Sequence, residues 1–448
     1  MTPPPKTVTG AHMTSTAGPD PIGPEAASIS SLPPELLMLI LLHVDSAADM
    51  NSLSQTCQGM YSLVLDPHLA AQWLLKCQPT KAMWLAAEKM QSTDIMLQLL
   101  HLGASPAKMY DGRYSSYTPL KLAAMWGHPK VVEVLLQNHD VRGNVSDAGG
   151  ALFTTIERGD IECLKALLVP HSPVHANSRV DSSFFSLMFP DFPRSSPLHA
   201  AASCPNRNAP LAAKVLIEHG GVCTARDSDG QTPLHMACVA MRPMSYRMPC
   251  NPSTQFEVVR TLLSAPGGPN ALAVRDSLGR TPLHVACGRE ASSWVIDCLL
   301  GTPGGLTALS APDNRGQTPL HSACGNASSR IVPILLDAPG GVGVAARVAA
   351  RDHRGQTPLH AVCGSTHCRP WDQVDVVRAL LNMGGLDVID ATDNQGRTPL
   401  RLAAENAVDC CEVLLHAGSK ALHIPDSMGL TPVDVSFGGA KRLMLRWK

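Results

Sequence analysis

One seven-residue motif recurs along most of this 448-residue chain and constrains its fold more than any other feature. Its copies are TPLKLAA at 118, SPLHAAA at 196, TPLHMAC at 232, TPLHVAC at 281, TPLHSAC at 318, TPLHAVC at 357, TPLRLAA at 398 and TPVDVSF at 431. From 196 onward the interval between copies is 33 to 49 residues, and weaker copies fit at 81–87 and 150–160. A period of this size indicates a stack of about ten similar units.

Each position of the motif has a physical role in a helix hairpin. Thr caps the first helix and Pro occupies its first turn, where the missing N–H costs nothing. Leu enters the core, and the following Ala-Ala or Ala-Cys keeps the helix slim enough for close packing. A second helix carries paired Val and Leu residues, as in Val131-Val132 with Leu135-Leu136. Gly-Gly stretches after the second helix are interpreted as helix-stop loops.

An Asp-x-x-Gly turn precedes most copies of the motif, as in DSLGRT, DNRGQT, DHRGQT and DNQGRT. Gly supplies a backbone conformation that other residues adopt only with strain, and Asp folds its side chain back on the turn. With the helix hairpin, this pattern resembles the ankyrin repeat over about residues 81–435. The resemblance predicts an all-α protein, an ankyrin-repeat α-solenoid with β-turn fingers at residues 79–448, whose last unit is truncated.

A separate helical segment precedes the repeats. Residues 1–28 are rich in Pro, Ser and Thr, which predicts a disordered tail. The stretch SSLPPELLMLILLHV at 30–44 predicts a short amphipathic helix, because its apolar residues follow i, i+3, i+4 spacing after a Pro-Pro start. A second helix is predicted after Asp49, and a third runs from Asp66 through Leu69 to Trp73.

The order of residues in this segment resembles the F-box family: Leu32-Pro33-x-Glu35-Leu36-Leu37-x-x-Ile40-Leu41, then Asp49-Met50, Leu53, Cys57, Leu63 and Asp66-Pro67. The resemblance implies a three-helix F-box-like domain at 29–78 that binds the Skp-type adaptor of a cullin–RING ubiquitin ligase. It assigns eight residues to the adaptor-binding face: Leu32, Pro33, Glu35, Leu36, Ile40, Leu41, Leu53 and Cys57. The alternative is a helical cap that covers the first repeat.

Composition excludes several kinds of partner. The net charge is −1 and only 16% of residues are charged, so the chain offers no basic field for nucleic acid. The apolar run Leu36–Val44 is too short for a membrane span, which needs about 20 residues. The 14 cysteines are scattered through a chain without a signal-peptide pattern. We expect reduced thiols in a cytoplasmic or nuclear protein.

Neither a metal site nor an enzyme is predicted. The pairs His235/Cys238, His284/Cys287, His321/Cys324 and His360/Cys363 have the look of zinc ligands. Each His, however, stands at the helix-start position of the repeat, and each Cys replaces its small Ala. The sequence contains no G-x-x-x-x-G-K-[ST], H-E-x-x-H or G-x-S-x-G motif, so we expect no catalytic residues and no cofactor.

The substrate of such a protein is expected on the concave side. The turn needs only its Asp and Gly, which leaves the two residues between them for recognition. The candidates are Asn314, Arg315, His353, Arg354, Asn394 and Gln395. Arg315 and Arg354 suggest a locally positive patch for an acidic or phosphorylated partner; the alternative is that they are solvated tips.

Three insertions interrupt the repeat pattern. The insertion at 170–195 holds Phe184, Phe185, Phe189 and Phe192, and it either packs onto the stack or forms a recognition element. Insertions at 241–255 and 364–375 are expected to replace tight turns inside helix hairpins. Taken together, the two resemblances imply a substrate receptor of a cullin–RING ubiquitin ligase that binds adaptor, cullin and an unknown protein substrate. The alternative is an ankyrin scaffold or inhibitor without a ubiquitin role.

Overall fold

The computed structural model describes residues 36, 66–77, 79, 81–87, 92–106, 117–142, 144–170, 172, 174–178, 195–204, 206–239, 252–289, 291–339, 343–366 and 368–447. The chain divides into two compact units, Met1–Trp73 and Leu74–Lys448.

The first unit contributes little to the described residues. Leu36 has helical conformation and an exposed side chain. Helix α4 spans Pro67–Cys77 and begins where the sequence predicts the third helix. Asp66 caps α4, since its Oδ1 accepts hydrogen bonds from the backbone N–H groups of His68 and Leu69 at 3.0 and 3.2 Å. The predicted tail at 1–28 and the other two predicted helices, Leu36 apart, lie outside the described residues.

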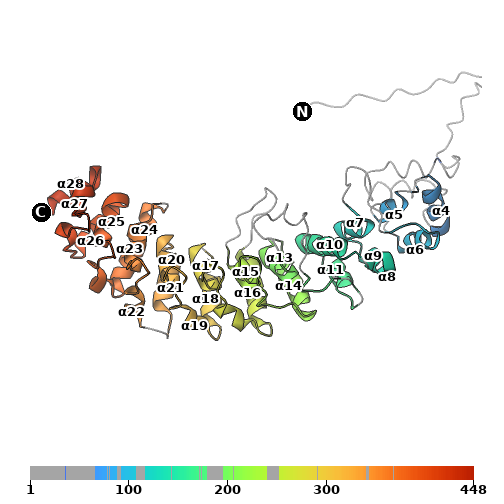
Figure 1. Cartoon of the computed structure of the whole chain (residues 1–448), viewed down its shortest axis with the longest axis horizontal. Helices are drawn as coiled ribbons and strands as arrows, with labels where there is room; N and C mark the ends of the chain where they lie inside the picture. Colours follow the sequence, from blue (N-terminus) through green and yellow to red (C-terminus); the bar gives the residue numbers. More distant parts are fainter. Residues whose placement is uncertain are drawn as a thin grey trace, which may run out of the picture. The chain divides into compact units, whose positions relative to one another are not determined.

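The second unit consists of helix hairpins, ten of which are described (Figure 1). Their first helices are α5 (Ala82–Leu85), α7 (Pro119–Trp126), α10 (Val145–Arg158), α13 (Pro197–Ser203), α15 (Pro233–Cys238), α17 (Pro282–Gly288), α20 (Pro319–Gly325), α23 (Pro358–Cys363), α25 (Pro399–Asn406) and α27 (Pro432–Val435). Their second helices are α6 (Thr93–His101), α8 (Pro129–Gln137), α11 (Ile161–Leu167), α14 (Ala209–Glu218), α16 (Pro252–Ser264), α18 (Ser293–Gly301), α21 (Ile331–Asp337), α24 (Pro370–Asn382), α26 (Val408–His416) and α28 (Gly438–Arg446).

The hairpins stack into two layers. From α13 to α27 each first helix packs against the next first helix, and from α14 to α28 each second helix packs against the next second helix. Alanine and cysteine of the motif, such as Ala286 and Cys287, are fully buried between the layers. This confirms the predicted α-solenoid. The cysteines of the described segments are free thiols, most of them buried.

The repeated motif starts the first helices other than α5 and α10 as predicted. Thr232 has extended backbone at the N-cap of α15, its side chain accepts a hydrogen bond from the His235 N–H, and Pro233 is the first helical residue. The same Thr-Pro start opens α7, α17, α20, α23, α25 and α27. The chain therefore enters these seven first helices in the same way, which keeps their repeats in register.

The Gly-Gly stretches end the second helices but are not simple loops. Gly267, Gly304 and Gly384 have left-handed backbone, with φ of 76°, 92° and 108°, which stops the preceding helix. A short helical turn then follows in each case: η3 (Pro269–Ala273), α19 (Gly305–Ala308) and η4 (Gly385–Val388). Similar turns, α9 (His139–Arg142), α22 (Val344–Val348) and η5 (Ala421–His423), stand at the same place in other repeats.

The insertions are partly helical, which corrects the loops expected at 241–255 and 364–375. Helix α16 already begins at Pro252 and α24 at Pro370, and both have 13 residues against 9 in α18 and α26. Part of each insertion therefore extends the second helix. Residues 240–251, and 179–194 with the four phenylalanines, lie outside the described residues.

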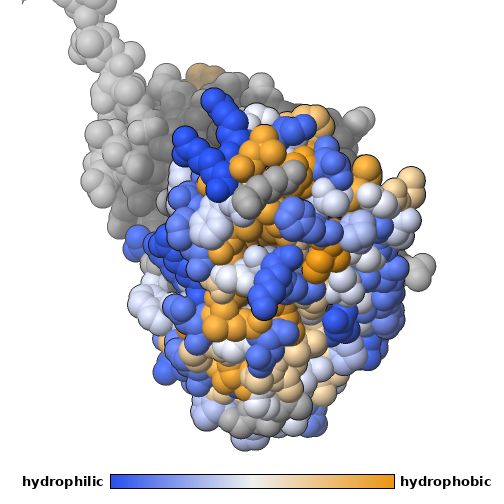
Figure 2. Space-filling model, turned by 90° about the vertical axis from the view of Figure 1, so that its left-hand side faces the viewer, coloured by the Kyte–Doolittle hydropathy of each residue, from blue (hydrophilic) through white to orange (hydrophobic). Residues whose placement is uncertain are grey.

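The C-terminal end of the stack exposes apolar side chains. Met428 and Phe437 are 80% and 78% exposed, and Leu445 and Trp447 are also exposed. Figure 2 shows this end with apolar and hydrophilic side chains interspersed. Among the described helices, none combines the length and the apolar character that a membrane span requires.

Candidate binding surface

The motif histidine bonds to its own helix start through Nδ1 and to the next repeat through Nε2. In His321, Nδ1 accepts a hydrogen bond from the Thr318 backbone N–H at 3.2 Å, which fixes the ring as the neutral Nε2–H tautomer. Nε2 therefore donates to the Gln356 carbonyl at 3.0 Å, in the finger of the following repeat. The same Nε2–carbonyl distance, 3.0 Å, recurs at His199, His235, His284 and His360.

In two copies of the motif a cation stands in place of the histidine and makes the connection to the next repeat. Arg401 lies 3.1 Å from the Asp426 carboxylate of the next finger, and Lys121 lies 3.5 Å from Asp147 in the next repeat. Both carboxylates are buried. The connection between repeats is thus retained with an ion pair in place of an imidazole–carbonyl hydrogen bond.

Burial keeps these histidines uncharged. It lowers the pKa of His235 to about 4 and lowers the pKa values of His284, His321 and His360 below the ordinary value. Burial likewise raises the pKa of the Cys287 thiol well above its usual range. With both nitrogens of each imidazole occupied by backbone groups, the His and Cys pairs form part of the repeat. The described segments hold no group of three metal-ligating side chains.

The Asp-x-x-Gly turns form fingers that are connected to one another. In each turn the Asp carboxylate accepts two backbone N–H bonds: Asp313 Oδ1 lies 2.7 Å from Arg315 N and 2.8 Å from Gln317 N. One backbone hydrogen bond then links each finger to its neighbour, as from His353 N–H to the Arg315 carbonyl at 2.9 Å. The series runs through Ser277, Asn314, His353, Asn394 and Ser427. The fingers form a continuous edge.

This edge corrects the expectation that both residues between Asp and Gly are free for recognition. Asn314 Nδ2 donates to the Ser277 carbonyl at 3.1 Å, and Asn394 Nδ2 donates to the His353 carbonyl at 3.0 Å. The first residue of each pair thus faces the preceding finger. The side chains of Arg315 and Arg354, the second residues of their pairs, have no described bonding partner.

Two neighbouring arginines are already paired within their own fingers. Arg280 lies 2.8 Å from Asp276, and Arg397 lies 2.8 Å from Asp393. Both carboxylates are buried at the base of the turn. These arginines stabilise the finger and contribute less to an external field than unpaired arginines do.

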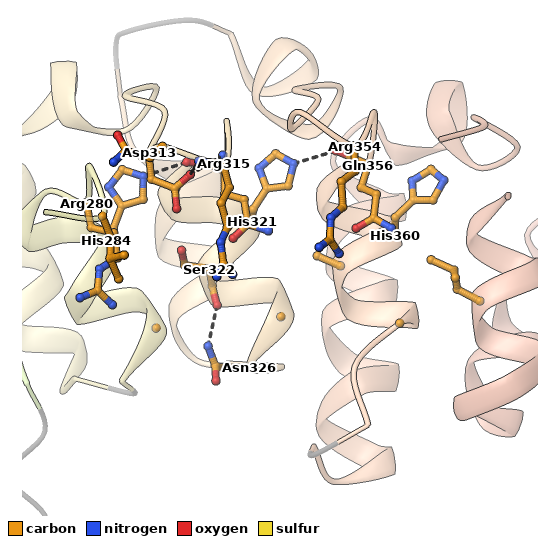
Figure 3. A pocket seen from close by; sticks show the side chains of 18 of the residues that line it. Arg280, His284, Asp313, Arg315, His321, Ser322, Asn326, Arg354, Gln356 and His360 are labelled. Atoms are coloured by element: carbon orange, nitrogen blue, oxygen red, sulfur yellow. Dashed lines mark hydrogen bonds between the residues drawn. The ribbon is translucent and has the colours of Figure 1, made fainter. Parts of the chain in front are cut away.

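A hollow of about 750 Å³ lies on the side of the stack formed by the fingers and first helices of four successive repeats, α17, α20, α23 and α25. Figure 3 shows the Arg280, Arg315 and Arg354 side chains following one another along it, beside the motif histidines. Of the predicted substrate residues, Asn314, Arg315 and Arg354 line the hollow, whereas His353, Asn394 and Gln395 are exposed but do not line it.

Sequence reasoning missed the floor of this hollow. Arg289, Ser322 and Asn326 line it from the first helices or the residues just after them, and Asn326 Nδ2 donates to the Ser322 carbonyl at 2.9 Å. Their positions in the repeat are variable and carry no motif, so no pattern marked them. A signal was nonetheless present, since they stand at or after the C-terminal half of TPLHVAC and TPLHSAC.

Most predicted adaptor-binding residues cannot be placed. Leu32, Pro33, Glu35, Ile40, Leu41, Leu53 and Cys57 lie outside the described residues, as do Phe184 and Phe185. Leu36 is helical with its side chain 46% exposed. The adaptor-binding face therefore stays a prediction from the sequence.

Comparison with known proteins gives two family matches. The family model for ankyrin repeats (3 copies) matches at 83–180, 152–244, 250–348 and 343–423, and the F-box-like model matches at 29–72. A curated relative, ankyrin repeat and SOCS box protein 11 from Danio rerio, is 31% identical over 120 residues, which is 27% of this chain and 35% of the relative. The chain thus spans about a third of that relative's length.

Among solved structures, the chain is similar to the human ASB11 ankyrin repeat domain. The TM-score is 0.40 with 20% identity, and the match covers 57% of this chain and 98% of that one.

Proposed function

This chain belongs to the ankyrin-repeat family and carries an F-box-like segment, and from that premise we propose that it is the substrate-recognition subunit of a cullin–RING ubiquitin ligase. The observation that carries the proposal is the presence of both modules in one chain, the F-box-like match at 29–72 and the ankyrin match from 83 onward. Both are protein-interaction modules, so one can hold the ligase and the other its substrate.

The F-box-like segment supplies the ligase side of the proposal. In this proposal its predicted apolar face, which includes Leu32, Pro33 and Ile40, binds the Skp-type adaptor, which in turn connects to the cullin. The exposed Leu36 side chain is compatible with such a face. An apolar stripe of this kind on a short helical segment needs a partner to cover it.

The ankyrin stack supplies the substrate side. Its first helices and fingers form a hollow that is lined by four connected repeats. The motif histidines and the Asp carboxylates of the fingers make their hydrogen bonds within the fold. The chain performs no chemistry in this proposal and takes no cofactor. It raises the local concentration of a protein substrate beside the catalytic subunits, in the cytoplasm or nucleus.

Direct binding to purified Skp-type adaptor tests the ligase side. We expect the full chain to bind it and Ile40→Asp, or Leu32→Ala with Pro33→Ala, to abolish binding, because an unpaired carboxylate in an apolar interface costs several kcal/mol. Leu211→Asp is the matched control, since Leu211 is 53% exposed on α14 in the repeats. Normal binding by Ile40→Asp would refute the assigned face, and no binding by the wild type would favour a scaffold or inhibitor without a ubiquitin role.

A further inference from the structure

One side chain per repeat is left available along the hollow. The second residue of successive fingers is Leu278, then Arg315, then Arg354, and all three are exposed and line the hollow. Each finger is fixed to its neighbour by the backbone bonds that Asn314 N–H donates to the Leu278 carbonyl at 3.0 Å and His353 N–H donates to the Arg315 carbonyl at 2.9 Å. The three side chains therefore stand on a rigid edge in a fixed order: apolar, basic, basic.

The hollow carries a net positive charge after internal ion pairs are removed. Arg280 and Arg397 are neutralised by finger carboxylates, and Glu405 is paired with Arg401 at 2.8 Å. Three lining arginines remain, Arg289, Arg315 and Arg354, against one lining carboxylate, Asp313, which is buried at the base of its finger. Within the described part of the chain, none of these three guanidinium groups has an ion-pair partner.

The repeat spacing sets the spacing of a complementary ligand. Packed helices lie roughly 8–10 Å apart, and an extended peptide advances about 3.3 Å per residue. One repeat therefore corresponds to about three residues of an extended peptide laid along the hollow. Groups that meet Leu278, Arg315 and Arg354 in turn should recur at every third peptide position.

We propose that the hollow binds an extended acidic peptide segment of the substrate, with one apolar residue and two carboxylate residues at successive third positions. The apolar residue contacts Leu278, and the carboxylates pair with Arg315 and Arg354. This inference rests on the proposed function only in assigning the peptide to a substrate protein. Binding of the peptide to the hollow needs no adaptor.

Carboxylates fit this arrangement better than phosphate groups. Arg315 and Arg354 come from different repeats, so each meets a ligand group singly. A single guanidinium matches a single carboxylate in bidentate geometry, whereas phosphorylated motifs are commonly recognised by clusters of arginines. The motif histidines add no charge to the hollow, since both their nitrogens are bonded within the fold.

Fluorescence anisotropy with the full chain and synthetic peptides tests the spacing. The probes are Ser/Gly peptides with one Leu and two Glu at every third position, made in both chain directions. The comparison peptide has the same composition with the two Glu adjacent. We expect one spaced peptide to bind about tenfold more tightly than the adjacent one, a difference of about 1.4 kcal/mol. Equal binding of the spaced and adjacent peptides would overturn the inference. So would binding of a peptide with phosphoserine in place of Glu when neither Glu peptide binds.

Charge exchange tests the two arginines. The variant with Arg315→Glu and Arg354→Glu should bind the Glu peptide at least about tenfold more weakly than the wild type. The same variant should bind a peptide with Lys in place of Glu. Arg330→Glu with Arg378→Glu makes the same change of charge on exposed residues outside the hollow and should bind like the wild type. Equal loss in both variants would overturn the inference. Adaptor binding should persist in the hollow variant, so failure here and failure of the proposed ligase role are separate results.

Discussion

The motif histidine is the residue that most clearly links sequence to stack. Its Nδ1 accepts from the Thr at the start of its own helix, and its Nε2 donates to the finger of the next repeat, as His235 does to the Arg280 carbonyl. The Nδ1 bond requires the neutral ring, because a protonated Nδ1 cannot accept a hydrogen bond. The zinc-like His and Cys spacing arises because the repeat places a histidine at the helix start and a small residue one turn later.

Acid should therefore weaken the stack through these histidines. Their pKa values are lowered in the folded state, to about 4 for His235, so below pH 6.5 the unfolded chain binds more protons than the folded one. Above pH 6.5 the histidines are neutral in both states and do not reduce the free energy of unfolding. As the pH falls from 6.5 toward 4, that free energy decreases. We expect a lower melting temperature at pH 5 than at pH 7.5.

A substitution can assign this effect. His235→Gln should lower the melting temperature at pH 7.5, because the connection to the next finger is lost, but its melting temperature should change less with pH. The exposed His423 provides the control as His423→Gln. If His235→Gln keeps the full pH dependence of the wild type, the buried histidines are not its source.

At the scale of the element, the finger turns out to be more constrained than the sequence suggests. Its Asp and Gly are recognisable as a turn, and the Thr-Pro start locates the first helices to the residue. The bonds between fingers could not be predicted, because they join residues far apart in the sequence. Asn314 and Ser277 are 37 positions apart, and Asn394 and His353 are 41 positions apart. The exposed lining residues differ in type from repeat to repeat, as Leu278, Arg315 and Arg354 do at one finger position, so the character of the hollow emerges only when four repeats are stacked.

A glycine substitution measures how much the backbone conformation of the finger contributes to stability. Gly316 has φ of 78°, and a Cβ there would lie 2.8 Å from the His353 backbone nitrogen. Gly316→Ala should destabilise the protein by about 1–3 kcal/mol. Gly301→Ala is the matched control, since Gly301 ends α18 with nothing within 4 Å of the added Cβ, and it should be neutral or slightly stabilising. Equal denaturation midpoints for the two variants would contradict the rigid edge.

At the scale of the whole molecule, the chain combines two modules with different kinds of binding surface. The ankyrin stack is stabilised repeat by repeat, so its surface residues can change without loss of the fold. That freedom explains why the sequence predicts the architecture well and the substrate poorly. In the proposed function the F-box-like segment has the opposite character, because one adaptor sets the requirements on its predicted binding face.

The central claim is that this chain delivers a bound protein to a ubiquitin ligase, and the most direct measurement compares the ubiquitylation of its partners. Tagged full-length wild type and Ile40→Asp would be recovered from cells, and their co-purified proteins quantified together with the ubiquitin attached to them. We predict that Ile40→Asp recovers the same non-adaptor partners in larger amounts and with less ubiquitin. Identical amounts with identical ubiquitylation would contradict the account and identify the chain as a scaffold.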